Sequence, residues 1–224
     1  MSDAATGMLV VWTNVAPGGE ADFDAWYTRE HVADRVNVPG FRNGARYEAV
    51  RGDPRFLAVY ETDTVAVLSS PPYRERLNHP TPWTRRVMPS FRDTVRATCR
   101  VIANAGGGIG GVQRTCRIDP IPGQADTLRA ALTGELPRHL IGQTGVIRVR
   151  VVEAIPLATT AQTAETAMRG TDRPVTFALL IDGQEIAALE MAGRAVDSVL
   201  QGVKDIIADS PSVGDYRLMF YLGR

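Results

Sequence analysis

The chain has 224 residues, of which 44% are apolar and 22% are charged, and this composition is typical of a soluble globular protein with a substantial core. Its 25 basic residues balance 25 acidic ones, so the charge gives no reason to expect nucleic acid or an anionic membrane as a partner. No apolar stretch approaches the ~20 residues needed to cross a bilayer, and Met1 to Gly7 lacks the basic and apolar pattern of a signal peptide.

The two cysteines favour a cytoplasmic location. Cys99 and Cys116 lie in separate strand-like segments, and neither belongs to a Cys-x-x-Cys motif typical of a redox or zinc site. We therefore expect two buried thiols in a reducing cytoplasm, in a protein that is a monomer or a homodimer.

Strands and helices alternate in a definite order through the first hundred residues. Runs rich in apolar and β-branched residues predict strands at 8–13, 41–50, 55–61 and 91–103. A helix is predicted after the Ala-Pro-Gly-Gly turn that ends at residue 19. A broken helical region is predicted over 64–88, where four prolines interrupt the pattern.

The first predicted helix carries an aromatic stripe. Five residues recur at i, i+3, i+4, i+7 and i+8 and so share one face, which we expect to turn toward the core: Phe23, Trp26, Tyr27, Glu30 and His31. Pro39-Gly40 ends this helix, because proline disfavours helical geometry in the residue before it and glycine allows the turn. The following strand is then expected to bring Tyr47 back beside the helix.

The same order of elements begins again after residue 111. Strands are predicted at 112–118, 145–155, 175–182 and 215–222, with helices at 124–140 and 186–207. The fold class predicted is therefore α+β, with the order β-α-β-β-α-β of the ferredoxin-like unit occurring twice in tandem. We assign residues 1–105 to the first unit, 106–111 to a glycine-rich linker and 112–224 to a second, degenerate unit.

A residue-level alignment of the two halves indicates an internal repeat. A single offset places Pro17-Gly18 opposite Pro122-Gly123 and Gly40 opposite Gly145. A period of about 100 residues fits a duplicated domain better than a solenoid, whose repeats are ~20 to 50 residues long. The offset places His31 opposite Leu136, so the second half has no ionisable group at this position.

Each ferredoxin-like sheet has one face covered by its helices and one open apolar face, which must be buried. Two such sheets packed against each other satisfy this requirement within one chain. We therefore predict an intrachain α+β barrel, with an apolar cavity in its first half.

Three motifs in the first half resemble the EthD-like branch of the dimeric α+β barrel superfamily. They are Phe23-Asp24-Ala25-Trp26-Tyr27-x-x-x-His31-Val32, Val38-Pro39-Gly40-Phe41 and Ala45-Arg46-Tyr47. The resemblance implies that one chain carries both halves of a barrel that relatives build from two subunits. The superfamily includes cofactor-free monooxygenases, lactone isomerases, polyketide cyclases and haem-degrading proteins, and in EthD-like relatives the histidine at the helix end often faces a cleft.

His31 is the best candidate for a catalytic group, because imidazole exchanges protons near neutral pH. Tyr47 is the candidate hydrogen-bond donor that would orient a substrate oxygen. The alternative for His31 is a structural histidine that is hydrogen-bonded at a helix end.

Aromatic side chains are candidates for the walls of a substrate pocket, because ligand pockets are mostly apolar with a few polar groups. The alternative for each of them is ordinary core packing. The predicted substrate-binding residues are Trp12, Asn14, Trp26, Tyr27, Tyr60 and Trp83.

Several common sites are not indicated. Gly106 to Gly111 matches G-x-G-x-x-G, but a strand pattern follows where a dinucleotide site requires a helix, so we interpret this segment as a linker and expect no cofactor. The three histidines have no ligand-type spacing, so no metal site is predicted, and no G-x-S-x-G motif indicates a serine nucleophile.

The sequence thus predicts an enzyme that uses histidine-based proton transfer on a small hydrophobic or aromatic compound, as an isomerase, cyclase or lyase. One alternative is a monooxygenase, either cofactor-free or haem-dependent. Another is a non-catalytic protein that binds a small ligand.

Overall fold

The computed structural model describes residues 6–155 and 162–224, and in these residues eight strands form one closed antiparallel barrel. The strands are β1 Gly7–Val15, β2 Phe41–Arg51, β3 Phe56–Thr62, β4 Phe91–Gly106, β5 Val112–Ile118, β6 Val146–Ala154, β7 Phe177–Gly183 and β8 Ser212–Gly223. Their order around the barrel is β1-β3-β2-β8-β5-β7-β6-β4.

Each half of the chain contributes four adjacent strands in the same relative order. The first half gives β4-β1-β3-β2 and the second gives β8-β5-β7-β6. The two sets are hydrogen-bonded to each other along β2 and β8 and along β4 and β6, which closes the barrel. The predicted α+β fold class, with two ferredoxin-like units forming an intrachain barrel, is therefore confirmed.

Short helices connect the strands of the first half. They are α1 Glu20–Trp26, η1 Tyr27–His31, α2 Val32–Val36, η2 Val65–Ser69, α3 Pro71–Asn78, α4 Pro82–Val87 and η3 Met88–Ser90. The second half has α5 Ala125–Thr133, α6 Leu136–Ile141, α8 Ala164–Arg169, α9 Ile186–Gly202 and η4 Lys204–Ile206. No helix in the described ranges is both long enough and apolar enough to span a membrane.

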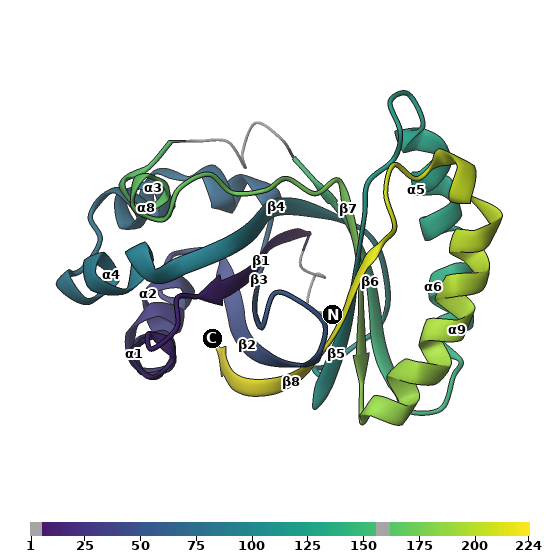
Figure 1. Ribbon diagram of the computed structural model, residues 1–224, viewed down its shortest axis with the longest axis horizontal. Coiled ribbons are helices and arrows are strands. Elements are labelled where there is room, and N and C mark those ends of the chain that lie inside the picture. The colour runs from purple at the N-terminus through teal and green to yellow at the C-terminus, as the bar shows by residue number, and fades with distance from the viewer. Residues whose placement is uncertain (1–5, 156–161) are drawn as a thin grey trace.

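The helices form two layers on opposite sides of the barrel (Figure 1). The α5, α6 and α9 helices cover the strands of the second half, whereas α1 to α4 cover those of the first half. One helix crosses between the layers: α8 follows β6 of the second half but packs beside α3 of the first half.

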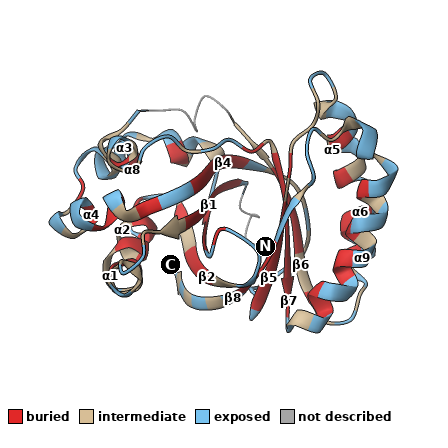
Figure 2. Ribbon diagram, in the orientation of Figure 1, coloured by how far each residue is buried: buried red, intermediate tan, exposed pale blue. Residues whose placement is uncertain are grey.

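The alternation of side chains along the strands divides the buried residues into three clusters, which are the barrel interior and one helix–sheet core in each half. On β1, Met8, Val10 and Trp12 point into the barrel, whereas Leu9 and Val11 face the first helix layer. Because successive strand residues point to opposite faces, one strand supplies both the barrel interior and a helix–sheet core. Figure 2 shows the resulting buried stripes on the strands and on the inner faces of the helices.

The helix that carries His31 is continuous but not uniform. A π-helical turn, η1, separates α1 from α2 and ends at His31 itself. Such turns insert an extra residue into a helix and are frequent at functional sites. The predicted aromatic stripe is buried as expected at Phe23, Trp26 and Tyr27.

The connection between the halves begins inside a strand. β4 continues to Gly106, three residues past its predicted end, and Gly106 has φ +77°. A Cβ at this position would lie 2.3 Å from the Ile147 carbonyl oxygen, so a glycine is required where the chain leaves β4.

Candidate functional site

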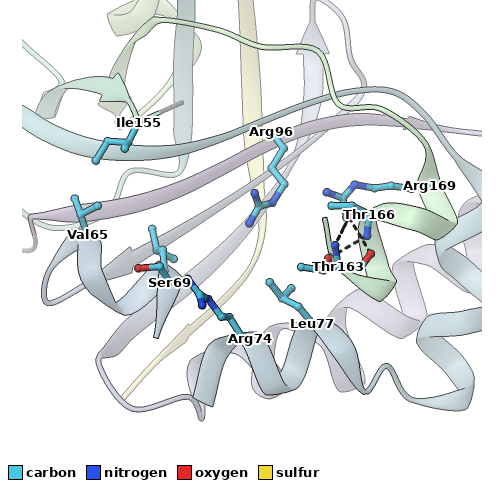
Figure 3. A pocket seen from close by; sticks show the side chains of 10 residues that line it. Val65, Ser69, Arg74, Leu77, Arg96, Ile155, Thr163, Thr166 and Arg169 are labelled. Atoms are coloured by element: carbon cyan, nitrogen blue, oxygen red, sulfur yellow. Dashed lines mark hydrogen bonds between the residues drawn. The ribbon is translucent and has the colours of Figure 1, made fainter. Parts of the chain in front are cut away.

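A cavity of about 290 Å³ lies between the first-half helices and α8, and we call it the arginine cleft. Figure 3 shows the side chains that surround it, which come from β4, η2, α3, the α8 segment and Ile155, the residue after β6. Its lining combines three arginines with hydroxyl-bearing and apolar residues: Val65, Leu68, Ser69, Arg74, Leu77, Arg96, Ile155, Thr163, Thr166 and Arg169.

Arg96 is the most unusual group in the arginine cleft. Its neighbours Val95 and Ala97 point into the barrel, so Arg96 points to the helix layer, where only 8% of it is exposed. One guanidinium nitrogen, Nη2, donates to the Tyr73 hydroxyl at 3.2 Å. Within residues 6–155 and 162–224, no carboxylate lies within ion-pair distance of Arg96. A buried cation therefore faces the cleft with a neutral hydroxyl as its partner.

The other two arginines of the cleft differ from Arg96. Arg169 on α8 makes a bidentate ion pair with Asp172, at 2.9 and 2.6 Å, so its charge is already balanced. Arg74 on α3 is exposed at the rim. The field in the cleft is thus positive, with Arg96 as its deepest unbalanced charge.

The α8 helix is anchored over the first half by a buried ion pair. Arg35 on α2 donates through Nη2 to the Glu165 carboxylate and through Nη1 to Asp34 at 2.8 Å. Both Arg35 and Glu165 are buried, at 2% and 3% exposure. Thr163 caps α8 by accepting from the Thr166 backbone N–H. These contacts fix the second-half segment that completes the cleft.

His31 is buried as the stripe predicted, but it does not line the arginine cleft. Its ring packs against Trp26 and Tyr27, with centroid distances of 4.1 and 5.0 Å. Burial, and then the positive charges of Arg35 and Arg169, hold the pKa of His31 well below its ordinary value. The imidazole is therefore neutral at pH 7, and its ring nitrogens make no hydrogen bond to any described residue.

Tyr47 lies on the opposite face of the sheet from His31. It points into the barrel with Ala45 and Val59, whereas the His31 ring packs in the first helix layer. The two predicted catalytic side chains are thus separated by the sheet and do not share a site. The sequence pattern correctly placed β2 beside the helix, but the strand alternation directs Tyr47 away from it.

The predicted substrate-binding residues divide in the same way. Trp26, Tyr27 and Tyr60 are buried in the first helix–sheet core, and burial raises the pKa of Tyr27 to about 12. Trp12 is fully buried inside the barrel, where its indole N–H donates to the Thr115 hydroxyl at 3.0 Å. None of these four lines the arginine cleft.

The remaining two predicted residues have structural contacts. Asn14 donates to the carboxylates of Asp53 and Asp93 and accepts from the Arg55 backbone N–H, so it joins the end of β1 to the β2–β3 hairpin and to the start of β4. Trp83 donates to Asp22 at 2.9 Å on the outer side of α4. Neither residue lines the arginine cleft.

Sequence reasoning did not identify Arg96 and Arg169. An arginine between apolar residues of a strand is typical of a solvent-facing position, and Arg96 is buried only because the helix layer and α8 cover it. The one sequence feature that could have indicated this cleft is the long connection between β6 and β7, which is long enough to carry a helix such as α8 over the first half.

Comparison with known proteins shows a similarity of fold only. No family model matches the sequence, and no curated protein matches it. A solved structure of an anthrone oxidase-like protein aligns with a TM-score of 0.69 at 13% identity, over 99% of this chain and 94% of that chain. A protein of Fusobacterium nucleatum that is provisionally named a monooxygenase aligns with a TM-score of 0.65 at 10% identity, over 99% and 96% of the two chains.

A third structure, from Lactobacillus acidophilus and also provisionally named a monooxygenase, aligns with a TM-score of 0.62 at 7% identity, over 97% and 96% of the two chains. These neighbours share the α+β barrel along nearly their whole length, so the fold expected from the resemblance is confirmed. The EthD-like branch and the tandem duplication stay predictions. The chain therefore has the α+β barrel fold of these neighbours.

Proposed function

We propose that this protein is a small-molecule enzyme and that its substrate, a compact apolar compound with a negatively charged oxygen, binds in the arginine cleft. The observation that carries this proposal is Arg96, a buried guanidinium that faces the cleft with only the Tyr73 hydroxyl as a partner.

The energetics of burial favour an anionic ligand. An ion removed from water costs several kcal/mol unless a counter-charge compensates it. A ligand oxyanion would supply that counter-charge to Arg96, and a hydrogen bond to a charged group contributes ~1.5–3 kcal/mol. The neutral Tyr73 hydroxyl offers less, so Arg96 has capacity left for a ligand.

The size and walls of the cleft indicate the rest of the ligand. The cavity of about 290 Å³ is at the lower end of the ~300–1,000 Å³ usual for small-molecule sites. Val65, Leu68 and Leu77 supply apolar walls. These features suit one or two aromatic rings that carry a carboxylate, phenolate or enolate oxygen.

A reaction that develops negative charge on the substrate oxygen is the one that Arg96 would accelerate, because a fixed cation stabilises that charge in the transition state. Enolisation of an aromatic ketone is such a reaction, and it is the proton-transfer step of the isomerase, cyclase or lyase chemistry expected from the sequence. His31 stays the candidate base predicted from the sequence, but its ring does not line the cleft, so this proposal rests on Arg96 and not on His31. Tyr47 has no part in this site.

The names of the structural neighbours support oxygenation as a second candidate reaction. Two of them carry a provisional monooxygenase name and one is called anthrone oxidase-like. An anthrone is an enolisable aromatic ketone, and its enolate would be an intermediate common to proton transfer and to cofactor-free oxygenation. We do not favour the haem-dependent alternative, because no histidine among the described residues lines the cleft to ligate an iron.

Binding of an anion and of its neutral isostere tests the role of Arg96. We would titrate 1-hydroxy-2-naphthoate and 1-hydroxy-2-naphthamide by isothermal calorimetry into the wild type, Arg96→Gln and, as a control, Arg138→Gln, whose side chain is 79% exposed in the second half. Loss of a charged hydrogen bond predicts naphthoate binding to Arg96→Gln that is roughly 10- to 100-fold weaker, with little change for the amide. Equal loss for both compounds, or none, would contradict the proposal.

Enzymatic action needs its own measurement. Exchange of the anthrone methylene protons with deuterated solvent, followed by NMR, reports enolisation without requiring oxygen. We expect faster exchange with the wild type and Arg138→Gln than with Arg96→Gln. Tight binding of naphthoate with no exchange would favour the non-catalytic ligand-binding alternative instead.

A further inference from the structure

A second cavity, of about 280 Å³, opens at one end of the barrel, and we call it the barrel-mouth pocket. Its rim includes Ile109, from the segment that joins β4 to β5, and Tyr221 of β8, which are 37% and 45% exposed. Its inner wall includes Tyr47, which is 1% exposed. The pocket therefore extends from solvent into the barrel interior, on the other side of the sheet from the arginine cleft.

Charged side chains gather at this end of the barrel interior. Glu61 accepts from both Arg148 and Arg150, and Arg150 also donates to Asp182 at 2.6 Å. Of these four, Asp182 is fully buried and Arg150 is 3% exposed. The two arginines and the two carboxylates cancel in charge, so the set is electrically balanced.

Fold stability alone does not account for this arrangement. Buried ion pairs are often no better than apolar residues of similar volume, because desolvation offsets their attraction. Arg150 Nε is buried and has no hydrogen-bond partner among the described residues. The Tyr47 hydroxyl also makes no hydrogen bond to a described residue, and Tyr47 lies in the wall of the pocket. A buried donor that is left unpaired, such as Arg150 Nε, costs ~1–3 kcal/mol. The unpaired Tyr47 hydroxyl is thus a donor available to a molecule in the pocket.

The balance of charge and the unused donors define the partner's chemistry. A ligand with a net charge would upset the compensation between Glu61, Asp182 and the two arginines, whereas hydroxyl groups both donate to carboxylates and accept from guanidinium groups. Burial is the main reason that the pKa of Tyr47 lies well above its ordinary value, so its phenol keeps its proton and is a donor. The Tyr221 ring at the rim offers an apolar face for C–H groups.

We propose that the barrel-mouth pocket binds one uncharged polyhydroxylated molecule of about monosaccharide size, with Tyr47 donating to one of its oxygens. This site is independent of the arginine cleft and of the function proposed for it. Its volume is too small for a larger glycan to be enclosed.

Ligand-observed NMR tests the proposal on the intact chain. Saturation-transfer spectra would be recorded with D-glucose and myo-inositol as uncharged probes, and with glucuronate and glucosamine as charged probes. We expect transfer to at least one uncharged probe and weaker transfer to both charged ones. Tyr47→Phe should weaken binding of that uncharged probe at least fivefold.

The control is Tyr216→Phe, the same substitution at another buried tyrosine of the barrel. The Tyr216 hydroxyl donates to the Pro54 carbonyl oxygen in the β2–β3 hairpin, away from the mouth, so polyol binding should not change. A pocket that holds only water would give no transfer to either uncharged probe, and that result overturns the proposal. Equal binding of charged and uncharged probes, or equal binding by Tyr47→Phe and the wild type, would also overturn it.

Discussion

The ion pair that holds α8 against the first half offers a direct test of how the cleft is built. In Glu165→Gln, Arg35 keeps Asp34 at 2.8 Å but loses its buried counter-charge. Breaking a buried pair from one side costs ~3–5 kcal/mol, and because Asp34 remains we expect a loss of roughly 2–3 kcal/mol. At about 2–4 °C per kcal/mol for a chain of this size, the melting temperature should fall by roughly 4–12 °C.

Urea denaturation followed by circular dichroism measures this loss, with calorimetry for the melting temperature. Glu135→Gln is the matched control, since its carboxylate is 86% exposed and pairs only with exposed Arg138, and it should be indistinguishable from the wild type. The double variant Arg35→Met with Glu165→Leu should recover much of the stability, because it removes both charges. If Glu165→Gln were as stable as the control, the ion pair would not be the anchor of α8.

Three further predictions follow from buried groups. Because the pKa of His31 is lowered in the folded state, the unfolded chain takes up a proton on His31 at higher pH than the folded chain does. The contribution of His31 to the free energy of unfolding should therefore be constant above pH 6.5 and fall by at most ~1.4 kcal/mol per pH unit below pH 6.5. Urea denaturation of His31→Leu at pH 5–7 should lack this slope. Thr115→Val leaves the Trp12 indole N–H unpaired, which should cost ~1–3 kcal/mol by urea denaturation, more than Thr115→Ser costs. Burial raises the pKa of Cys99 and of Cys116 to about 12, so neither thiol should react with Ellman's reagent at pH 7.5 until the chain unfolds; rapid native labelling would contradict their burial.

The fold could be predicted because its determinants are local and periodic. Alternating strands and turn glycines specify the elements, and the aligned glycines occupy the same conformation: Gly40 and Gly145 have φ +90° and +81°. The aligned pair Gly18 and Gly123 agree as closely, at +87° and +85°. Glycines aligned by a single offset thus adopt the same backbone conformation at equivalent turns of both halves. For this reason the order of elements could be predicted from the sequence.

The site could not be predicted in the same way, because it depends on contacts between distant segments. The sequence predicted Tyr47 beside the helix that carries His31. The two-residue period of a strand instead places the Tyr47 side chain on the other face of the sheet, in the barrel interior. Arg96 and Arg169 lie far apart in the sequence, and they line one cavity only because α8 reaches the other half. Periodicity identifies the face of an element but not what will cover that face.

The unequal connections between paired strands explain why the two halves differ despite their common strand order. In the second half, residues 155–176 join β6 to β7, and this length carries α8 across to the first helix layer. The corresponding connection in the first half is the tight hairpin at 52–55, which is too short to reach the helices α5, α6 and α9. The first half is therefore covered by a helix of the second half, whereas the second half receives no such helix from the described residues of the first. Since the α8 segment supplies Thr163, Thr166 and Arg169, the arginine cleft requires residues from both halves, and a first half expressed alone would lack one wall of it.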